Sequence, residues 1–331
     1  MVATVVPAVL LSIVYQTGVV STWWLELLQY VPFPAFLLSA IVAFGLSFRL
    51  GRAWRLAAAI GLVLVLTVLM GGVAGHADRG SGHVRMMTYN IKAWLAEHRN
   101  GGFSPLVWEV ALQDPDILVM QDAAELTEMR EQAPDTASPI FKRRQVFAFG
   151  QYIVVSRFPL RDCQVGQIPY RGEPHTYVRC IVTAQGVDID LVTVHFKSPR
   201  DGLNATRFER ADGVGEWQQN FNDRLSQSSR LAADISRRRR PLILAGDLNA
   251  PESSPVVRHL LERGLRDAFS SAGWGYGYTH GHALKLRFSF LRIDHILVSP
   301  DIGVQDSFVG GKAASEHRPV IADLWLQREP D

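Results

Sequence analysis

Two hydrophobic patterns divide the chain. From residue 1 to 76, apolar residues run almost without interruption, and a membrane-spanning helix needs about 20 of them. Three stretches approach that length: about Thr4 to Val20, Val31 to Phe48 and Trp54 to Val73. After residue 83, short apolar runs alternate with amphipathic stretches. The pattern predicts a membrane anchor of three transmembrane helices (1–76), a linker (77–83) and a soluble domain (84–331).

The short runs of the second part are rich in β-branched residues and bounded by turn residues, as is typical of strands. They are VRMMTYNI, DILVMQD, QYIVVSRF, YVRCIVTA, VDIDLVTVHF, PLILAGDLN, RIDHILVS and PVIADLWL. Helices are expected near Pro105 to Leu112, over Thr206 to Arg238 and over Pro255 to Arg263. Strands covered by helices imply a layered α/β architecture.

Charge separates the same two parts. The first 76 residues carry only Glu26, Arg49, Arg52 and Arg55, out of 32 acidic and 34 basic residues in the chain. The remainder therefore holds 31 of each sign and is formally neutral. Dedicated nucleic-acid binders carry a basic excess that releases counterions from phosphates, so neutrality disfavours a nucleic acid as partner.

The arginines also predict an orientation. Arg49, Arg52 and Arg55 precede the third apolar stretch, and short arginine-rich loops stay in the cytoplasm. With three spans, the domain after residue 83 then lies on the extracytoplasmic side of a cell (inner) membrane. The alternatives are two spans, or one span with interfacial helices. A cleaved signal peptide is disfavoured because the first stretch lacks a basic start.

The chain has two cysteines, Cys163 and Cys180. They fall on consecutive predicted strands, without the spacing of a metal site. In an extracytoplasmic domain they could form a disulfide; otherwise they are two buried thiols.

Polar residues gather at the downstream ends of the predicted strands: Asn90, Asp122, His195, Asp247 and Asn249. Taken singly, each has a structural explanation, such as a strand terminator, a helix cap or a hydrogen-bonded core histidine. Alternate residues of an extended segment point the same way, so Asp247 and Asn249 of GDLN are expected to face one site. Five polar groups at corresponding ends indicate a binding site.

A second group follows near the C-terminus. Asp294 lies in RIDHIL, and Glu316 and His317 are adjacent in ASEHRPV. A carboxylate behind a histidine fixes its tautomer and supports its charged form, which suits proton transfer near neutral pH.

The ordered series TYN, DILVMQD, SRFPL, VTVHF, GDLN, RIDH and SEHRPV resembles the endonuclease/exonuclease/phosphatase superfamily over residues 84 to 326. The resemblance implies an α/β fold of the α+β four-layer type, with two mixed β-sheets packed face to face between helices. It also implies a metal-dependent phosphoric ester hydrolase.

The resemblance further implies a metal site. Asn90 and Asp122 would hold a divalent cation, Mg²⁺ or alternatively Mn²⁺, with Glu316 nearby. Hard cations prefer such oxygen ligands. Two positions depart from the family pattern, because Asp122 replaces a glutamate and Glu316 replaces an aspartate. These changes indicate either mutual adjustment of one site or a weakened one.

The resemblance also implies a catalytic role for each of the remaining residues. His317, oriented by Asp294, would be the catalytic histidine, and Asp247 would position or deprotonate the attacking water. Asn249 would hold that water and the phosphate, and His195 would bind the phosphoryl oxygens.

The substrate is not named by the motifs. An anchored extracytoplasmic domain meets the lipid bilayer, and the arrangement is similar to bacterial three-span members of the superfamily associated with glycopeptide resistance. A lipid phosphate or pyrophosphate of the envelope is therefore the expected substrate. The alternatives are an extracellular nuclease and a catalytically silent binding module. The oligomeric state stays open.

Overall fold

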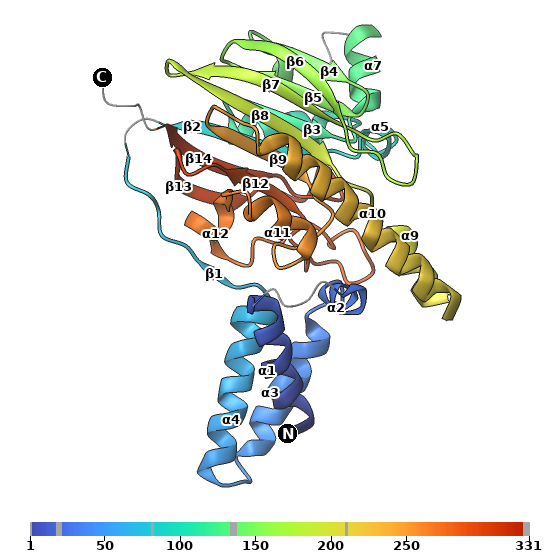
Figure 1. Ribbon diagram of the computed structural model, residues 1–331, viewed down its shortest axis with the longest axis vertical. Helices are drawn as coiled ribbons and strands as arrows, with labels where there is room; N and C mark the ends of the chain where they lie inside the picture. The colour runs from blue at the N-terminus through green and yellow to red at the C-terminus, as the bar shows by residue number, and fades with distance from the viewer. Residues whose placement is uncertain (1, 18–21, 81–82, 133–137, 209–210, 327–331) are drawn as a thin grey trace.

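The computed structural model describes the chain except residues 1, 18–21, 81–82, 133–137, 209–210 and 327–331. A bundle of apolar helices projects from one end of a larger α/β domain (Figure 1). The bundle contains α1 (Val2–Thr17), α3 (Pro34–Ser47) and α4 (Arg52–Leu64), which continues into the π-helical η1 (Val65–Leu69). The short helix α2 (Trp23–Gln29) lies apart from the bundle, against the domain.

The helix ends differ from the expected spans for local reasons. The third stretch was expected to run to Val73, but η1 ends at Leu69 and Gly71 takes a positive φ of 68°. The second expected span, from Val31 to Phe48, begins as helix α3 at Pro34, because proline suits the first turn of a helix. The expected span from Thr4 to Val20 ends in residues 18–20, which lie outside the described part of the chain.

Among the described residues, one helix is long and apolar enough to cross a membrane, the continuous segment Arg52–Leu69. The pair α2 and α3 passes the same test together, with a bend of 77° between the two helices.

The first of two six-stranded sheets has the order β13-β14-β2-β3-β5-β4. It is mixed, because β2 and β3 are parallel and the other neighbours are antiparallel. Its strands are β2 (Val84–Asn90), β3 (Ile117–Gln121), β4 (Gln145–Phe149), β5 (Tyr152–Ser156), β13 (Ile302–Val309) and β14 (Val320–Leu326).

The second six-stranded sheet has the order β10-β12-β9-β8-β7-β6, with only β8 and β9 parallel. Its strands are β6 (Leu160–Gln167), β7 (Thr176–Ala184), β8 (Val187–His195), β9 (Leu242–Asp247), β10 (Arg266–Asp267) and β12 (Asp294–Val298). The separate pair of β1 (Val73–Ala74) and β11 (Trp274–Gly275) joins the end of the helical bundle to the domain.

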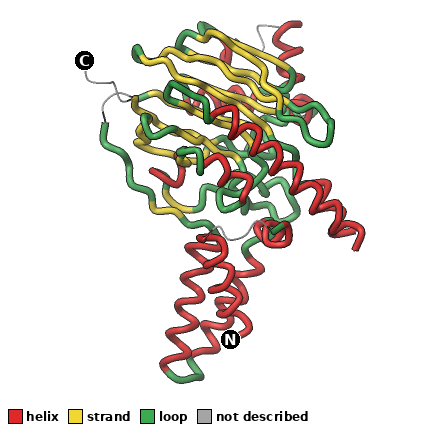
Figure 2. Tube along the Cα trace, in the orientation of Figure 1, coloured by secondary structure: helices red, strands yellow, loops and turns green. Residues whose placement is uncertain are grey.

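The two sheets pack face to face, and helices cover both outer faces (Figure 2). Successive side chains of a strand point to opposite faces. Met86 accordingly belongs to the core between the sheets, while Met87 belongs to the core under the helices. Burial on both faces explains why these strands are continuous apolar runs, and the predicted sandwich of two mixed sheets is confirmed.

Helices α5 (Ala93–Glu97), α6 (Ser104–Gln113), α7 (Ala124–Gln132) and α8 (Ser138–Phe141) follow the first strands, and α12 (Ala268–Ala272) follows β10. On the second sheet lie α10 (Ala211–Ile235) and α11 (Pro255–Leu261), preceded by α9 (Arg200–Phe208). The single helix expected over Thr206 to Arg238 is thus wrong at its start, because α9 already covers residues 206–208 as a separate helix.

The linker is held against the domain rather than hanging free. The His76 amide donates to the Ser271 carbonyl at 2.8 Å. The Asp78 carboxylate pairs with Arg266 and accepts from the Val304 amide at 2.9 Å. These contacts place the segment that leaves the helical bundle along the surface of the domain.

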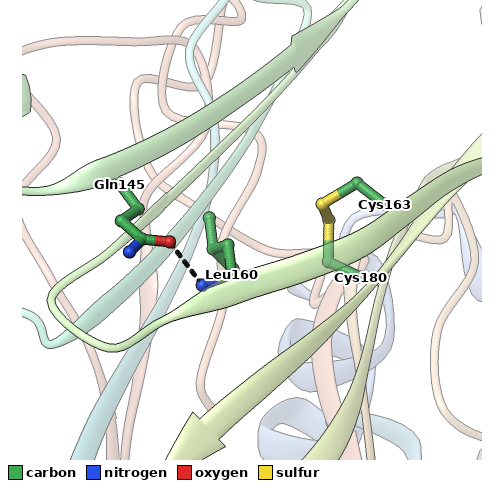
Figure 3. Close-up of a disulfide and its surroundings, with 4 residues drawn as sticks. All are labelled: Gln145, Leu160, Cys163 and Cys180. Carbon is green, nitrogen blue, oxygen red and sulfur yellow. Dashed lines mark hydrogen bonds between the residues drawn. A yellow bond between two sulfur atoms is a disulfide. The ribbon is translucent and has the colours of Figure 1, made fainter.

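Cys163 on β6 and Cys180 on β7 form a disulfide between adjacent antiparallel strands (Figure 3). Their Cα atoms are 4.1 Å apart, and 17 positions separate them along the chain. The register of the two strands shifts between Arg161 and Gln164, beside Cys163. Of the two alternatives left open by the sequence, the structure has the disulfide.

Candidate active site

The predicted polar residues meet at one rim of the sandwich. Parallel pairing sets Asn90 beside Gln121, the residue before Asp122, and sets His195 beside Asp247. Antiparallel pairing sets the first residue of β12, Asp294, opposite Asp247. The Asn90 side-chain amide donates to Asp247 Oδ2 at 2.9 Å and so links the two sheets. The strand ends of both sheets therefore build a single site.

The close approach of β8 and β9 requires the glycine of GDLN. A Cβ atom on Gly246 would lie 1.9 Å from the carbonyl oxygen of Val194, so a side chain there would displace the strand. Gly246 thus lets β9 lie against β8 and brings Asp247 level with His195.

His317 and Asp294 form a buried pair. The Nδ1 atom of His317 lies 2.9 and 3.2 Å from the two carboxylate oxygens of Asp294, while its Nε2 atom lies 3.8 Å from Asp247 Oδ2. Burial opposes the charged imidazolium, but the carboxylates of Asp294 and Asp247 outweigh it and raise the pKa of His317 above its usual value. The site thus favours a protonated His317.

Asp247 lies at the centre of the site and is 1% exposed. Besides the Asn90 amide it accepts the backbone amide of Asn249 at 2.8 Å, and His195 Nε2 lies 3.5 Å away. Burial, together with the nearby charge of Asp294, raises the pKa of Asp247. A carboxylate with a raised pKa is a better proton acceptor near neutral pH.

Asn249 does not lie on an extended segment, so the expectation that it points the same way as Asp247 by strand alternation was wrong. Its φ is +49°, in the left-handed region that asparagine tolerates better than most residues. The Asp247 side chain caps the backbone amide two residues later, which bends the chain into a turn. The Asn249 side-chain amide donates to the Phe196 carbonyl at 2.8 Å.

His195 is held from the first sheet. Its Nδ1 atom lies 2.7 Å from Gln151 Oε1, and its backbone amide donates to the Tyr152 hydroxyl at 3.2 Å. Burial lowers the pKa of His195 despite the nearby Asp122 and Asp247 carboxylates. A neutral His195 can direct Nε2 toward the centre of the site.

Asp122 follows β3 in a left-handed conformation, with φ of 49°. Its carboxylate pairs with the Lys92 ammonium group and lies 3.7 Å from His195 Nδ1. Burial favours the neutral acid, but His195 and Lys92 outweigh it and lower the pKa of Asp122. Asp122 is therefore an ionised carboxylate beside Asn90, whose Oδ1 accepts from the Lys92 amide at 3.3 Å.

Glu316 lies at the edge of this group. Its side chain is 21% exposed, and Oε2 is 3.3 Å from Arg200 Nη2. The preceding residue, Ser315, donates its hydroxyl to the Asn90 carbonyl at 2.7 Å. The backbone thus brings Glu316 near the end of β2, while its carboxylate is paired with Arg200.

A divalent metal fits the donor set. In the part of the chain that the structure describes, Asp247, Asp294 and His317 have ligand atoms within 4.8 Å of one another and form a possible metal site. This group shares no residue with the predicted set of Asn90, Asp122 and Glu316, although Asn90 contacts Asp247 directly. Oxygen donors dominate both groups, as a hard cation such as Mg²⁺ requires.

The sequence interpretation missed Lys92 and Gln151. Lys92 neutralises Asp122, and Gln151 orients His195. Lys92 directly follows the TYNI run, and that position was the only available signal. Nothing in the sequence indicated that Gln151 lies beside a histidine 44 residues later.

Residues 87–317 match the model of the Endonuclease/Exonuclease/phosphatase family. The chain therefore belongs to this family, whose members are metal-dependent phosphoesterases, and it carries a buried Asp/His site. No curated protein matches the chain.

Solved structures share the fold. An endonuclease/exonuclease/phosphatase from Bacteroides vulgatus is 17% identical, with a TM-score of 0.55, and the match covers 75% of this chain and 100% of that one. The human Nocturnin catalytic domain, solved with a bound sulfate anion, is 17% identical with a TM-score of 0.53 and coverage of 74% and 95%. Truncated Caenorhabditis elegans TDP2 is 16% identical, with a TM-score of 0.53 and coverage of 73% and 97%.

Proposed function

We propose that the chain is a membrane-anchored, Mg²⁺-dependent phosphoesterase that hydrolyses a phosphoester or pyrophosphate of an envelope lipid. The observation that carries the chemistry is the buried row of Asp294, His317 and Asp247, in which one imidazole lies between two carboxylates. Its position at the rim of both sheets leaves the row beside the oxygen donors of Asn90 and Asp122.

In this proposal the side chains divide the work. Asp294 holds His317 by Nδ1, so that Nε2 can hold or deliver a proton at a phosphoryl oxygen. Asp247 positions or deprotonates the attacking water, with Asn249 completing the turn that carries it. His195 would bind the phosphoryl oxygens through Nε2; because its Nδ1 proton is directed at Gln151 Oε1, Nε2 donates a hydrogen bond there only when the imidazole is protonated.

The metal would be held by Asn90 and Asp122, with Glu316 nearby. When bound, it would neutralise charge on the phosphoryl group and lower the pKa of bound water. Lys92 neutralises Asp122 in the structure, so its ammonium group would have to yield this carboxylate to the cation.

The surface of the helical bundle supports the anchor. Leu38, Phe48 and Leu56 are 66%, 63% and 64% exposed, which would be unfavourable in water but suits lipid. Arg49 lies in the turn between α3 and α4, and Arg52 is the first residue of α4, at the end of the bundle away from the domain (Figure 1). By the positive-inside rule this end would be cytoplasmic and the domain extracytoplasmic. The disulfide agrees, since disulfides persist in oxidising compartments.

The activity is tested with the full chain in detergent or nanodiscs. We expect Mg²⁺-dependent release of inorganic phosphate from a lipid pyrophosphate, faster than hydrolysis of a chromogenic phosphodiester or of single-stranded DNA, and abolished by EDTA. Preferential cleavage of DNA would instead support an extracellular nuclease. Absence of turnover with both Mg²⁺ and Mn²⁺ would support a silent binding module, which the pairing of Asp122 with Lys92 and of Glu316 with Arg200 would then explain.

The orientation is tested separately with reporter fusions. A reporter that is active only outside the cytoplasm is expected to be active when fused to the C-terminus and inactive when inserted after Leu50, in the arginine-containing turn. A second reporter, active only in the cytoplasm, should give the opposite pattern. Exchange of these two patterns would place the domain in the cytoplasm and overturn the proposed localisation.

A further inference from the structure

The N-terminal segment reaches the catalytic domain through a buried polar cluster. Glu26 of α2 and Arg224 of α10 both have fully buried side chains, and Glu26 Oε1 lies 2.9 Å from Arg224 Nη1. Tyr30, just after α2, is 6% exposed, and the same guanidinium nitrogen donates to its hydroxyl oxygen at 2.7 Å. An acidic and a basic side chain from segments nearly 200 residues apart thus pair at one buried position.

This cluster holds the loop between β9 and α11, which carries Asn249. The Tyr30 hydroxyl donates to the Asn249 carbonyl at 2.7 Å, and Arg224 Nη1 lies 3.2 Å from the same oxygen. At the other end of the loop, the Ser254 hydroxyl donates to Glu26 Oε2 at 2.6 Å. The two residues from the N-terminal segment therefore contact both ends of the loop.

Stability alone does not account for burying these charges. Replacing a buried ion pair with apolar residues of similar volume is often neutral or stabilising, because desolvation offsets much of the attraction. The charged groups instead fix the direction of the hydrogen bonds that this cluster makes. The Tyr30 hydroxyl, whose pKa burial raises further above its usual value, is protonated and donates to the Asn249 carbonyl.

The orientation of the Asn249 carbonyl matters because Asn249 is hydrogen-bonded to Asp247 in the active site. Asn249 is in a left-handed conformation. Its backbone amide donates to the Asp247 carboxylate, and its side-chain amide donates to the Phe196 carbonyl. A rotation of the peptide after Asn249 would be transmitted to this residue and hence to the hydrogen bond on Asp247. The contact with Tyr30 opposes that rotation.

We infer that Glu26, Tyr30 and Arg224 are positioning residues that fix the Asn249 carbonyl and thereby the orientation of Asp247 in the active site. The N-terminal segment is then part of the support of the catalytic loop, in addition to any role as an anchor. The kinetic consequence rests on the proposed phosphoesterase activity, whereas the structural consequence does not.

The test compares two tyrosine variants of the full chain. Tyr30→Phe removes the hydroxyl on Asn249 and keeps the ring that packs edge-on against Trp217. Tyr278→Phe is the matched control, because the Tyr278 hydroxyl donates to the Met70 carbonyl at 2.7 Å and also joins the domain to the N-terminal segment. Both lose one hydrogen bond across the same junction, but only the first faces the catalytic loop.

We expect Tyr30→Phe to lower kcat about tenfold while KM changes little, as for the loss of one well-oriented hydrogen bond. Tyr278→Phe should retain the wild-type kcat, even if its Tm falls as much. An unchanged kcat in Tyr30→Phe, or equal losses in the two variants that follow their Tm values, would reduce the cluster to a structural role.

Hydrogen–deuterium exchange of residues 248–254 in the full chain gives a readout that needs no substrate. Exchange is expected to be faster in Tyr30→Phe and unchanged in Tyr278→Phe, because local opening depends on the contacts that close the loop. Equal exchange in wild type and Tyr30→Phe would overturn the inference. If the wild type turns over no substrate, the proposed function fails, while the exchange data still decide whether Tyr30 holds the loop.

Discussion

Replacing His317 with glutamine is expected to lower kcat about 10³-fold, within the range that positioned acid–base groups contribute. Glutamine can still hydrogen-bond to Asp294, but it cannot carry or transfer a proton. In the wild type, burial works against protonation, and the Asp294 and Asp247 carboxylates reverse this effect and raise the pKa of the imidazole. The variant removes the proton carrier and leaves both carboxylates in place.

The measurement is steady-state hydrolysis of the preferred substrate by full-length protein, together with thermal unfolding. His259→Gln serves as the control, because His259 lies on α11 and contacts Ser229 at 3.0 Å, away from the strand ends. Retention of most activity by His317→Gln, with His259→Gln also active, would exclude His317 from the chemistry.

Replacing Asp247 with asparagine is expected to lower activity and to change how stability depends on pH. Turnover should fall on the order of 10³-fold, because an amide cannot accept the proton of the attacking water. Asparagine loses one of the two oxygens that accept from the Asn90 and Asn249 amides, which lowers stability at every pH, so the effect of charge is measured from the pH dependence of Tm. Burial and the neighbouring Asp294 raise the pKa of Asp247, so the ionised carboxylate is less favourable in the folded state than in the unfolded chain.

The sign of the effect on stability follows from linkage. A group whose pKa is raised on folding contributes stability below its unfolded pKa and loses that contribution as the pH rises through its folded pKa. Asparagine stays neutral throughout, so the Tm of the variant minus that of the wild type should be more positive at neutral pH than in acid. The scans need EDTA, since a bound divalent cation would stabilise the wild-type carboxylate. A difference in Tm that does not become more positive from acid to pH 7 would contradict a raised pKa of Asp247 in the folded state.

The apolar runs with polar residues at corresponding ends predicted a layered α/β domain, and the resemblance carried by the short motifs added the sandwich of two sheets. β2, β3, β8 and β9 each end at or next to a predicted site residue, and parallel pairing brings their ends to one rim. The direct contact between Asn90 and Asp247 shows that this inference also holds between the two sheets.

The sequence was less informative about turns and about the partners of individual side chains. The expectation from strand alternation was wrong at Asn249, because the Asp247 carboxylate accepts from the Asn249 backbone amide and the chain bends into a turn. The pairing of Lys92 with Asp122 and of Arg200 with Glu316 depends on how far long side chains reach across neighbouring loops. Such pairings leave no periodic signal in the sequence.

The sequence by itself determined the family, the two-sheet architecture and most of the residues that meet at the site. The reason is that strands and helices follow from local burial patterns, while the family and its two-sheet fold follow from the resemblance of short motifs in a fixed order. Only the tertiary structure decided that Glu26 and Tyr30, in a segment predicted merely to anchor the protein, contact the loop of Asn249. Contacts of that kind depend on how α2 packs against α10 and the β9–α11 loop, and hydrophobic patterning along the chain carries no information about that packing.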